Sequence, residues 1–217
     1  LGDRLRANMR DGLRAAVPDP LTGLYNRRYA LPPFDRLAEH ARERGRPFAV
    51  LLADIDHFKA VNDTYGHAAG DTVRETLAAR LRDSLRAADL IARYGGEEFL
   101  VVLPDLDAYA ARNTAARLCR MIADNPVALP DGEKLTITLS IGVAIGRPGQ
   151  PFETRKLIHS ADRALYAAKD KGRNTIVMAD RITALPSALP PIPARTGSGD
   201  LVTPVPGPVR KRSASRG

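Results

Sequence analysis

Two stretches of this chain place carboxylates where they could hold a metal ion. Residues 93–105, RYGGEEFLVVLPD, set Glu97 and Glu98 directly after two glycines and directly before an apolar strand. Adjacent strand residues point to opposite faces of a sheet, so one of these two acids is hard to explain as surface charge. A bound metal ion would explain it.

Further carboxylates lie in residues 51–71, LLADIDHFKAVNDTYGHAAGD. Here an apolar strand ends in Asp54, and Asp56 follows two residues later, on the same face if the strand continues. Carboxylates at strand ends suit Mg²⁺, which takes oxygen ligands and usually shares them with substrate phosphates. For Asp56, capping of the following helix is an equally good interpretation.

Residues that could bind a nucleotide follow directly. Phe58 and Lys59 lie where the strand gives way to a helix, so their amides and the ammonium could hold a phosphate chain. Asn62, His67 and Asp71 follow at polar spacing, although a turn, a surface position and a helix cap explain them equally well. The sequence has no Walker loop, no GxGxxG motif and no cluster among its four histidines, which argues against P-loop, dinucleotide-binding and zinc proteins.

The elements that must position these residues alternate between helix and strand. Gly95 and Gly96 predict a tight two-residue hairpin with positive φ at both glycines, and a plain hairpin without a ligand is the alternative. The alternation predicts one α/β domain around a central, largely antiparallel sheet flanked by helices. The predicted helices cover 33–45, 69–87, 107–124 and 154–171, and the predicted strands cover 47–55, two segments within 89–103, 135–145 and 174–178.

Composition and charge narrow the class of protein. With 44% hydrophobic and 27% charged residues, the chain of 217 residues suits one globular domain of about 160 residues with extra segments at its ends. Five of its eight net positive charges lie in residues 181–217 and it has no Trp, which argues against nucleic-acid binding. The single cysteine, Cys119, predicts a core residue in a reducing, cytoplasmic setting. No apolar run approaches about 20 residues, so we expect neither a membrane span nor a signal peptide.

The two ends differ from the domain that we predict at residues 18–180. Residues 1–17 carry an apolar stripe among arginines, which predicts the last turns of a connecting helix. Because the chain begins with Leu rather than Met, we expect further segments upstream. Residues 181–217 hold seven of the 17 prolines and show no periodicity, so we expect a disordered, basic tail.

Five motifs, in order, carry a resemblance to a known family. They are DPLTGLYNRRY, DIDHFKAVNDTYGHAAGD, RYGGEEF, TITLSIGVA and ADRALYAAKDKGRN, and they cover about residues 18–178. Together they resemble the GGDEF diguanylate cyclases, above all the PleD-type response-regulator cyclases, in which receiver domains precede the cyclase. The resemblance implies a fold similar to the nucleotidyl cyclases and the polymerase palm. It also implies condensation of two GTP molecules into cyclic di-GMP by a homodimer, because each active site holds one GTP.

The resemblance assigns roles to single residues. Asp54, the carbonyl of Ile55 and Glu97 would bind Mg²⁺ (or Mn²⁺), and Glu98 would support them. Glu97 stands where the family usually has Asp, and it is also the residue usually offered as the catalytic base. The remaining implied contacts are Asn62 and Asp71 with the guanine edge, Phe58 and His67 with the substrate, and Lys59, Lys169 and Arg173 with the phosphates.

A second site precedes the hairpin. The RxxD spacing of Arg86 and Asp89 resembles the family's product-inhibition site, where the arginine binds guanine and phosphate of cyclic di-GMP and the aspartate binds the guanine edge. Arg117 is a candidate third contact, and an ion pair at a helix end is the alternative. The family's cross-linking arginine falls at His40 in this sequence, which leaves open how the product would bridge two domains.

The resemblance therefore implies a diguanylate cyclase that is inhibited by its own product. One alternative is a catalytically weak domain that only binds cyclic di-GMP, and another is an interaction protein whose sheet merely dimerises. The presence of Asp54, Asn62, Asp71, Glu97 and Lys59 argues against loss of catalysis. A protein that merely dimerises would not need acids at two strand ends.

Overall fold

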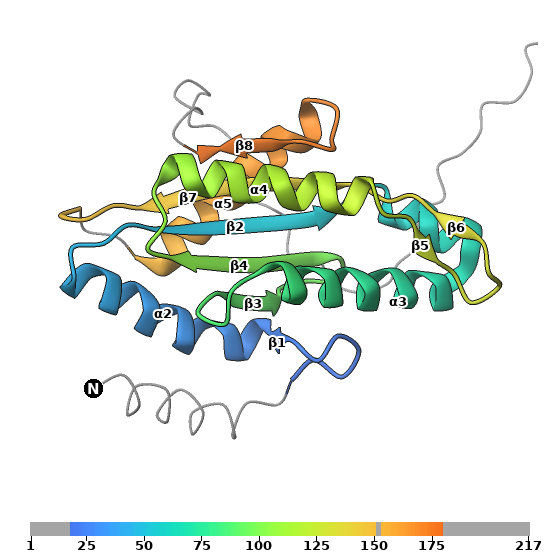
Figure 1. Ribbon diagram of the computed structural model, residues 1–217, viewed down its shortest axis with the longest axis horizontal. Helices are drawn as coiled ribbons and strands as arrows, with labels where there is room; N and C mark the ends of the chain where they lie inside the picture. The colour runs from blue at the N-terminus through green and yellow to red at the C-terminus, as the bar shows by residue number, and fades with distance from the viewer. Residues whose placement is uncertain (1–17, 151–152, 180–217) are drawn as a thin grey trace, which may run out of the picture. The chain divides into compact units, whose positions relative to one another are not determined.

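The computed structural model describes residues 18–150 and 153–179, and its centre is a six-stranded sheet in the order β1-β3-β4-β2-β7-β8 (Figure 1). The predicted connecting helix at 1–17 and the predicted tail at 181–217 lie outside the described residues. The strands are β1 (Tyr25–Asn26), β2 (Phe48–Ile55), β3 (Leu90–Arg93), β4 (Glu98–Pro104), β7 (Leu139–Gly146) and β8 (Ile176–Met178). The helices are α2 (Arg27–Glu43), α3 (Phe58–Ser84), α4 (Ala108–Ala123) and α5 (Thr154–Asp170), and a separate ribbon pairs β5 (Val127–Ala128) with β6 (Lys134–Leu135).

Strand β2 lies at the centre of the sheet. It pairs antiparallel with β4 on one side and with β7 on the other, and all eight of its residues are buried. The pairs at the two edges, β1 with β3 and β7 with β8, are parallel. The predicted fold class, a mostly antiparallel sheet flanked by helices, is confirmed.

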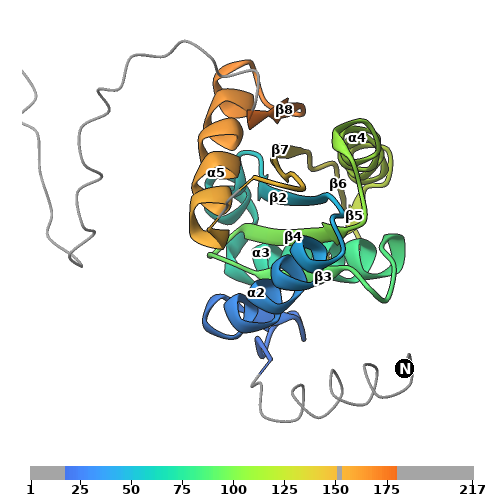
Figure 2. The same ribbon diagram turned by 90° about the vertical axis from the view of Figure 1, so that its left-hand side faces the viewer.

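Alternating residues of the central strands divide the hydrophobic core in two. Leu51 and Val101 pack with α3 and α4, whereas Leu52 and Leu100 pack with α2 and α5. Figure 2 shows α4 and α5 on opposite sides of the sheet. Asp54 continues the face of Leu52, so the sheet buries a carboxylate on the side that α5 covers.

Helix α2 begins earlier than predicted. It begins at Arg27 rather than at residue 33, because the side chain of Asn26 accepts hydrogen bonds from two amides of the first turn at 3.0 and 3.2 Å. Pro32 and Pro33 therefore lie inside the helix rather than before it. Strands β1 and β5, two residues each, were too short for the sequence pattern to predict. No helix in the described ranges has the length and apolar character needed to cross a membrane.

Cys119 lies in the core, as predicted. Its side chain is buried on α4 and its Sγ donates to the carbonyl of Leu139 at 3.5 Å. Burial raises the pKa of this thiol to about 12, so it stays protonated at neutral pH. A reactive thiol is thereby excluded at this position.

Candidate active site

Carboxylates and a lysine meet where β2 ends and β4 begins. Asp54 on β2 lies opposite Glu98 on β4 in the antiparallel register, so both side chains leave the sheet on the face that α5 covers. Lys169, in the last turn of α5, places its Nζ 2.8 Å from Oδ2 of Asp54. Asp54 is only 5% exposed, whereas 34% of the Lys169 side chain is exposed, so the carboxylate is shielded from water but the lysine is only partly so.

The electrostatics of this acidic cluster favour an added cation. Burial raises the pKa of Asp54, the ion pair with Lys169 opposes that rise, and the charges of Glu97 and Asp56 add to it, so that the pKa is raised overall. Burial also raises the pKa of Glu98, and the charge of Asp54 raises it further. The cluster is therefore short of positive charge, and a divalent ion would stabilise its ionised forms.

The donor atoms at this point fit Mg²⁺ or Mn²⁺ in type. The carbonyl of Glu97 accepts a hydrogen bond from the amide of Ile55 at 3.3 Å, which fastens the hairpin to the end of β2. The predicted ligands, the carboxylates of Asp54 and Glu97 and the carbonyl of Ile55, are hard oxygen donors. Mg²⁺ completes its shell with water and substrate phosphates. Water and substrate oxygens would have to fill the remaining coordination positions, because the described residues contain no group of three or more His, Cys, Asp or Glu that could hold a metal ion. The ammonium of Lys169 already sits on Asp54 as a cation would.

The hairpin differs from the predicted two-residue turn. Four residues connect β3, which ends at Arg93, to β4, which begins at Glu98, and neither glycine has a positive φ. The amides of Tyr94 and Gly95 both donate to the carbonyl of Glu98, at 2.7 and 3.2 Å. Gly95 matters for another reason, since a Cβ there would lie 2.4 Å from Oε2 of Glu98 and the Glu98 side chain would have to shift. This glycine makes room for the acid rather than for the turn.

Sequence reasoning missed an ion pair that anchors the hairpin. Arg93 donates through Nε and Nη2 to the carbonyl of Gly96 at 3.3 and 3.1 Å, and through Nη1 to both oxygens of Asp19 at 3.2 and 3.0 Å. Burial raises the pKa of Asp19, but hydrogen bonds from Thr22 and the charge of Arg93 outweigh it, so the pKa is lowered overall. Asp19 and Arg93 both belong to motifs that carried the family resemblance, yet no spacing rule joins residues 74 positions apart.

Helix α3 contains the residues predicted to bind guanine. It begins at Phe58 rather than at residue 69, and Gly66, with non-helical φ 82° and ψ 167°, divides it. Asn62 comes from the part before this break and Asp71 from the part after it. The Oδ1 of Asn62 is buried without a hydrogen-bond partner. An unpartnered buried acceptor is costly unless a ligand supplies the donor, so this atom is a candidate substrate contact.

The space beside Asn62 depends on a glycine. A Cβ at Gly70 would lie 2.0 Å from Oδ1 of Asn62 and 3.1 Å from Cζ of Phe58. Next to Gly70, the carboxylate of Asp71 forms an ion pair of 2.8 Å with Arg74, whose guanidinium lies 5.0 Å from the centroid of the Phe58 ring. Arg74 was not predicted. The structure thus brings three predicted substrate contacts together around Gly70.

The predicted phosphate contacts Lys59 and Arg173 lie at helix ends, and the predicted substrate contact His67 lies at a break within α3. Lys59 is exposed in the first turn of α3, and His67 is exposed just after the break at Gly66. Within the described part of the chain, no hydrogen bond or ion pair joins Lys59 or His67 to the acidic cluster. Arg173 lies beyond the helix that carries Lys169, because α5 ends at Asp170, and Arg173 has a left-handed φ of 68°.

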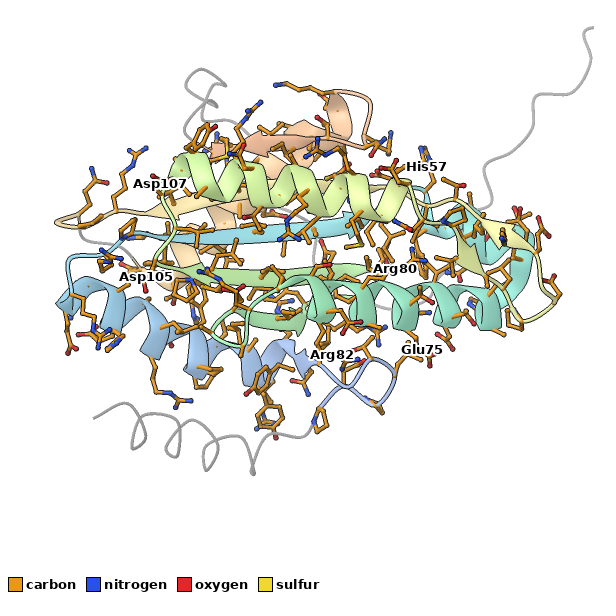
Figure 3. The ribbon with its side chains drawn as sticks, in the orientation of Figure 1. His57, Glu75, Arg80, Arg82, Asp105 and Asp107 are labelled. Atoms are coloured by element: carbon orange, nitrogen blue, oxygen red, sulfur yellow. The ribbon has the colours of Figure 1, made fainter. Side chains whose placement is uncertain are left out.

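The interpretation of Asp56 as a helix cap was wrong. The residue at the start of α3 is His57 (Figure 3), which makes no capping hydrogen bond through its side chain. Asp56 is buried and directs its carboxylate away from that helix, where it accepts hydrogen bonds from Thr138, Ser140 and the backbone of Asn174. Asp56 therefore does not cap α3, and both of its oxygens accept hydrogen bonds from protein groups.

The RxxD residues lie at the other end of the sheet. Arg86 pairs with Asp89 at 3.1 Å and also donates to the carbonyl of Pro104 at 3.2 Å, at the end of β4. Strand β4 separates Glu98 from Pro104 by about 20 Å at the usual rise per residue. Figure 3 places His57 and Asp105 at opposite ends of the sheet, in agreement.

Arg117, the candidate third contact, belongs to the same region. It donates to the carbonyl of Ser84, the last residue of α3, at 3.1 Å. Arg86 lies two residues after Ser84, so Arg86 and Arg117 both lie at the end of α3. Asp89 itself has a side chain that is almost fully buried, with an exposed fraction of 2%. His40, on α2, is half-buried.

Comparisons with known proteins agree on one family. The family model described as "Diguanylate cyclase, GGDEF domain" matches residues 16–175. The chain is 43% identical over 176 residues to the response regulator PleD of Caulobacter vibrioides, covering 81% of this chain and 38% of that protein. It is 38% identical over 158 residues to the diguanylate cyclase DosC of Escherichia coli, covering 73% and 34%. The chain thus spans little more than a third of the length of these relatives.

Solved structures agree in fold. The GGDEF domain of DgcB from Caulobacter crescentus in complex with c-di-GMP superposes with a TM-score of 0.71 at 34% identity, covering 75% of this chain and 93% of that one. The GGDEF domain of PA1120 from Pseudomonas aeruginosa gives a TM-score of 0.72 at 38% identity, covering 75% and 94%.

Proposed function

The chain belongs to the family of GGDEF-domain diguanylate cyclases, and from this premise we propose that it condenses two GTP into cyclic di-GMP. The observation that carries the proposal is the pairing of Asp54 with Lys169 beside Glu98, next to the hairpin that holds Glu97. A buried and a half-buried acid with raised pKa values, together with a lysine, suit phosphoryl transfer, in which positioning and charge stabilisation supply most of the acceleration. Relatives named as diguanylate cyclases support the same chemistry.

In the proposed reaction, the 3′-oxygen of one GTP forms a bond to the α-phosphorus of the other. The bond from that phosphorus to the bridging oxygen breaks, pyrophosphate leaves and the proton of the 3′-hydroxyl passes to water. The second half-reaction repeats these steps to close the ring. Asp54, Glu97 and the Ile55 carbonyl would hold Mg²⁺ or Mn²⁺, in keeping with the divalent-metal dependence that is general in this family. When bound, the ion lowers the pKa of the attacking hydroxyl and neutralises charge on the phosphates.

The chain's own residues would bind and orient the nucleotide. We assign the guanine edge to the Asn62 amide and the Asp71 carboxylate, with Phe58 and His67 as further substrate contacts. Lys59, Lys169 and Arg173 would bind phosphate oxygens and offset the charge that gathers on pyrophosphate. Lys169 would then exchange its ion pair with Asp54 for one with the substrate. Glu98, opposite Asp54 on the neighbouring strand, would add negative potential at the site.

Catalysis would require two copies of the domain. Each site binds one GTP, so a homodimer has to bring two α-phosphates and two 3′-hydroxyls face to face. We propose that residues 18–180 form the catalytic domain. The lone buried thiol of Cys119 supports a cytoplasmic location.

Product inhibition is the second part of the proposal. Arg86, Asp89 and Arg117 would bind cyclic di-GMP about 20 Å from the acidic cluster, a separation given by the length of β4. A second candidate function is a cyclic di-GMP binding module with weak catalysis, which is favoured by the cyclic di-GMP complex among the similar structures.

One experiment separates these functions. The chain is incubated with GTP and Mg²⁺, and in parallel with Mn²⁺, and the product is identified by mass, with Glu97→Gln as the control. Cyclic di-GMP from the wild type and none from the variant would support the cyclase. Calorimetric binding of cyclic di-GMP without turnover by either protein would support the binding module and contradict the cyclase.

A further inference from the structure

Asp56 has three partners from two other parts of the chain. Its Oδ1 accepts from the hydroxyl of Ser140 at 2.6 Å, and its Oδ2 accepts from the hydroxyl of Thr138 at 2.7 Å and from the amide of Asn174 at 2.9 Å. Thr138 and Ser140 flank the beginning of β7, whereas Asn174 lies in the connection from α5 to β8. The carboxylate therefore fastens that connection to the end of the sheet that carries Asp54.

The connection it fastens has an unusual backbone. Helix α5 ends in a Schellman motif, in which the amide of Gly172 donates to Lys169 and the amide of Arg173 donates to Ala168. Gly172, Arg173 and Asn174 then follow with φ of 106°, 68° and 44°. Left-handed conformations suit glycine but are uncommon for other residues, so two of them in succession require an external constraint.

The hydrogen bond from Asn174 to Asp56 supplies this constraint. Arg173 is the residue directly before that amide, and its side chain is exposed, so its direction depends on how the backbone at 173–174 is held. Lys169, four residues earlier, is already fixed by its ion pair with Asp54. Two of the three cations predicted to bind phosphate, Lys169 and Arg173, are thus held by two different carboxylates of the same DID motif.

We propose that Asp56 is a positioning residue that holds Arg173 in place to bind the triphosphate, an inference that rests on the proposed function. Both oxygens of Asp56 already accept hydrogen bonds from protein groups, so its task is to hold the loop and not to touch the substrate. Loss of this carboxylate would release the strained backbone and let the Arg173 side chain turn away from the phosphates.

Nucleotides that differ in phosphate number test the proposal. Calorimetry with Mg²⁺ compares GTP with GMP for the wild type and for Asp56→Ala. We expect GTP to bind about tenfold more weakly to the variant, since a charge-assisted phosphate contact is lost, while the affinity for GMP stays within about twofold. We also expect the amide of Asn174 to exchange its hydrogen faster in the variant. If Asp56→Ala does not fold, Asp56→Ser, which also lacks Oδ2, replaces it with the same expectations.

Three further variants make the test specific. Asp56→Asn keeps an acceptor for Asn174 and should restore GTP affinity to within about threefold, and Thr138→Val removes a different hydrogen bond to the same carboxylate and should leave GTP affinity unchanged. Because Asp56 acts through Arg173, adding Asp56→Ala to Arg173→Ala should weaken GTP binding no further.

The overturning results are distinct. Equal losses for GTP and GMP, or an Asp56→Ala effect that adds in full to Arg173→Ala, overturn this inference alone. A wild-type chain that binds no GTP overturns the proposed function and this inference with it.

Discussion

Replacing Gly70 by Ala should separate substrate binding from stability. A Cβ at this position would lie 2.0 Å from Oδ1 of Asn62, whereas Cβ contacts in proteins essentially never fall below 3.0 Å. The side chain of Asn62 therefore has to move by about an ångström or turn to another rotamer. Because its Oδ1 has no hydrogen-bond partner, this movement breaks none in the folded protein.

The expected effects on stability nearly cancel. Alanine favours the helix over glycine by roughly 0.5–1 kcal/mol, and Gly70 has a helical backbone that alanine adopts without strain. Displacement of the Asn62 side chain costs about 0.5–1.5 kcal/mol if it leaves its rotamer. We expect the free energy of unfolding to change by less than about 1 kcal/mol, measured by chemical denaturation.

The affinity for GTP should fall much more. The methyl group displaces the amide predicted to contact guanine and narrows the gap to Phe58, so we expect at least about tenfold weaker GTP binding by calorimetry. Asn62→Ala is the matched control, since it removes the displaced amide without adding a methyl group. In a chain that already carries Asn62→Ala, adding Gly70→Ala should change the affinity for GTP little further. GTP affinity within twofold of the wild type for Gly70→Ala would refute this account of the base site.

Four other substitutions test the remaining parts. Glu97→Gln should abolish cyclic di-GMP formation with the circular dichroism spectrum unchanged, because a metal-facing carboxylate loses its charge but not its shape; turnover near the wild-type rate would rule out its ligand role. Asp71→Ala should relax the preference for GTP over ATP in competition assays, since adenine lacks the donors that a carboxylate accepts from guanine, and an unchanged preference would leave Asp71 as a structural residue paired with Arg74. Arg86→Ala should keep the initial rate and weaken inhibition by added cyclic di-GMP about tenfold to a hundredfold, and an unchanged inhibition constant would reduce the RxxD pair to a structural one. Glu98→Gln should raise the melting temperature at about pH 8, because the raised pKa of Glu98 means that its ionisation destabilises the fold; this gain should vanish as the pH falls below the ordinary value of 4.5, and a gain that persists there would contradict the sign.

Strand β2 and the sheet around it could be predicted from the sequence because burial on both faces leaves a continuous apolar run. All eight residues of FAVLLADI are buried, and Asp54, an acid of the candidate site, interrupts the apolar run near its end. The beginning of helix α2 was harder to predict. Pro32 and Pro33 suggested a helix that begins at residue 33, whereas the Asn26 cap starts it six residues earlier. The local sequence pattern predicts a strand or helix well where burial determines which residues it contains. It predicts the ends of a helix less well where a single capping side chain sets them.

The residues of the candidate site could likewise be predicted from the sequence only in part. The sequence motifs named Asp54, Glu97 and Lys169, but no spacing rule shows that Lys169 reaches Asp54 across 115 positions. Asp56 was misinterpreted because a carboxylate before a helix normally caps it, whereas here its partners lie 82, 84 and 118 positions away. Contacts of such range belong to the tertiary fold and leave no local signature.

Several energetically unfavourable features gather at one end of the sheet, and their concentration supports a functional site there. Asp54 and Glu98 have carboxyl groups whose burial raises their pKa values, and Asn62 keeps an unpartnered acceptor. Arg173 and Asn174 hold left-handed backbones at the same end. A sequence selected for stability alone would remove such features, for example by replacing Asp54 with an apolar residue to match the rest of β2. Since each of them would be relieved or used when a metal-bound nucleotide binds, ligand binding is the simplest reason for keeping them together.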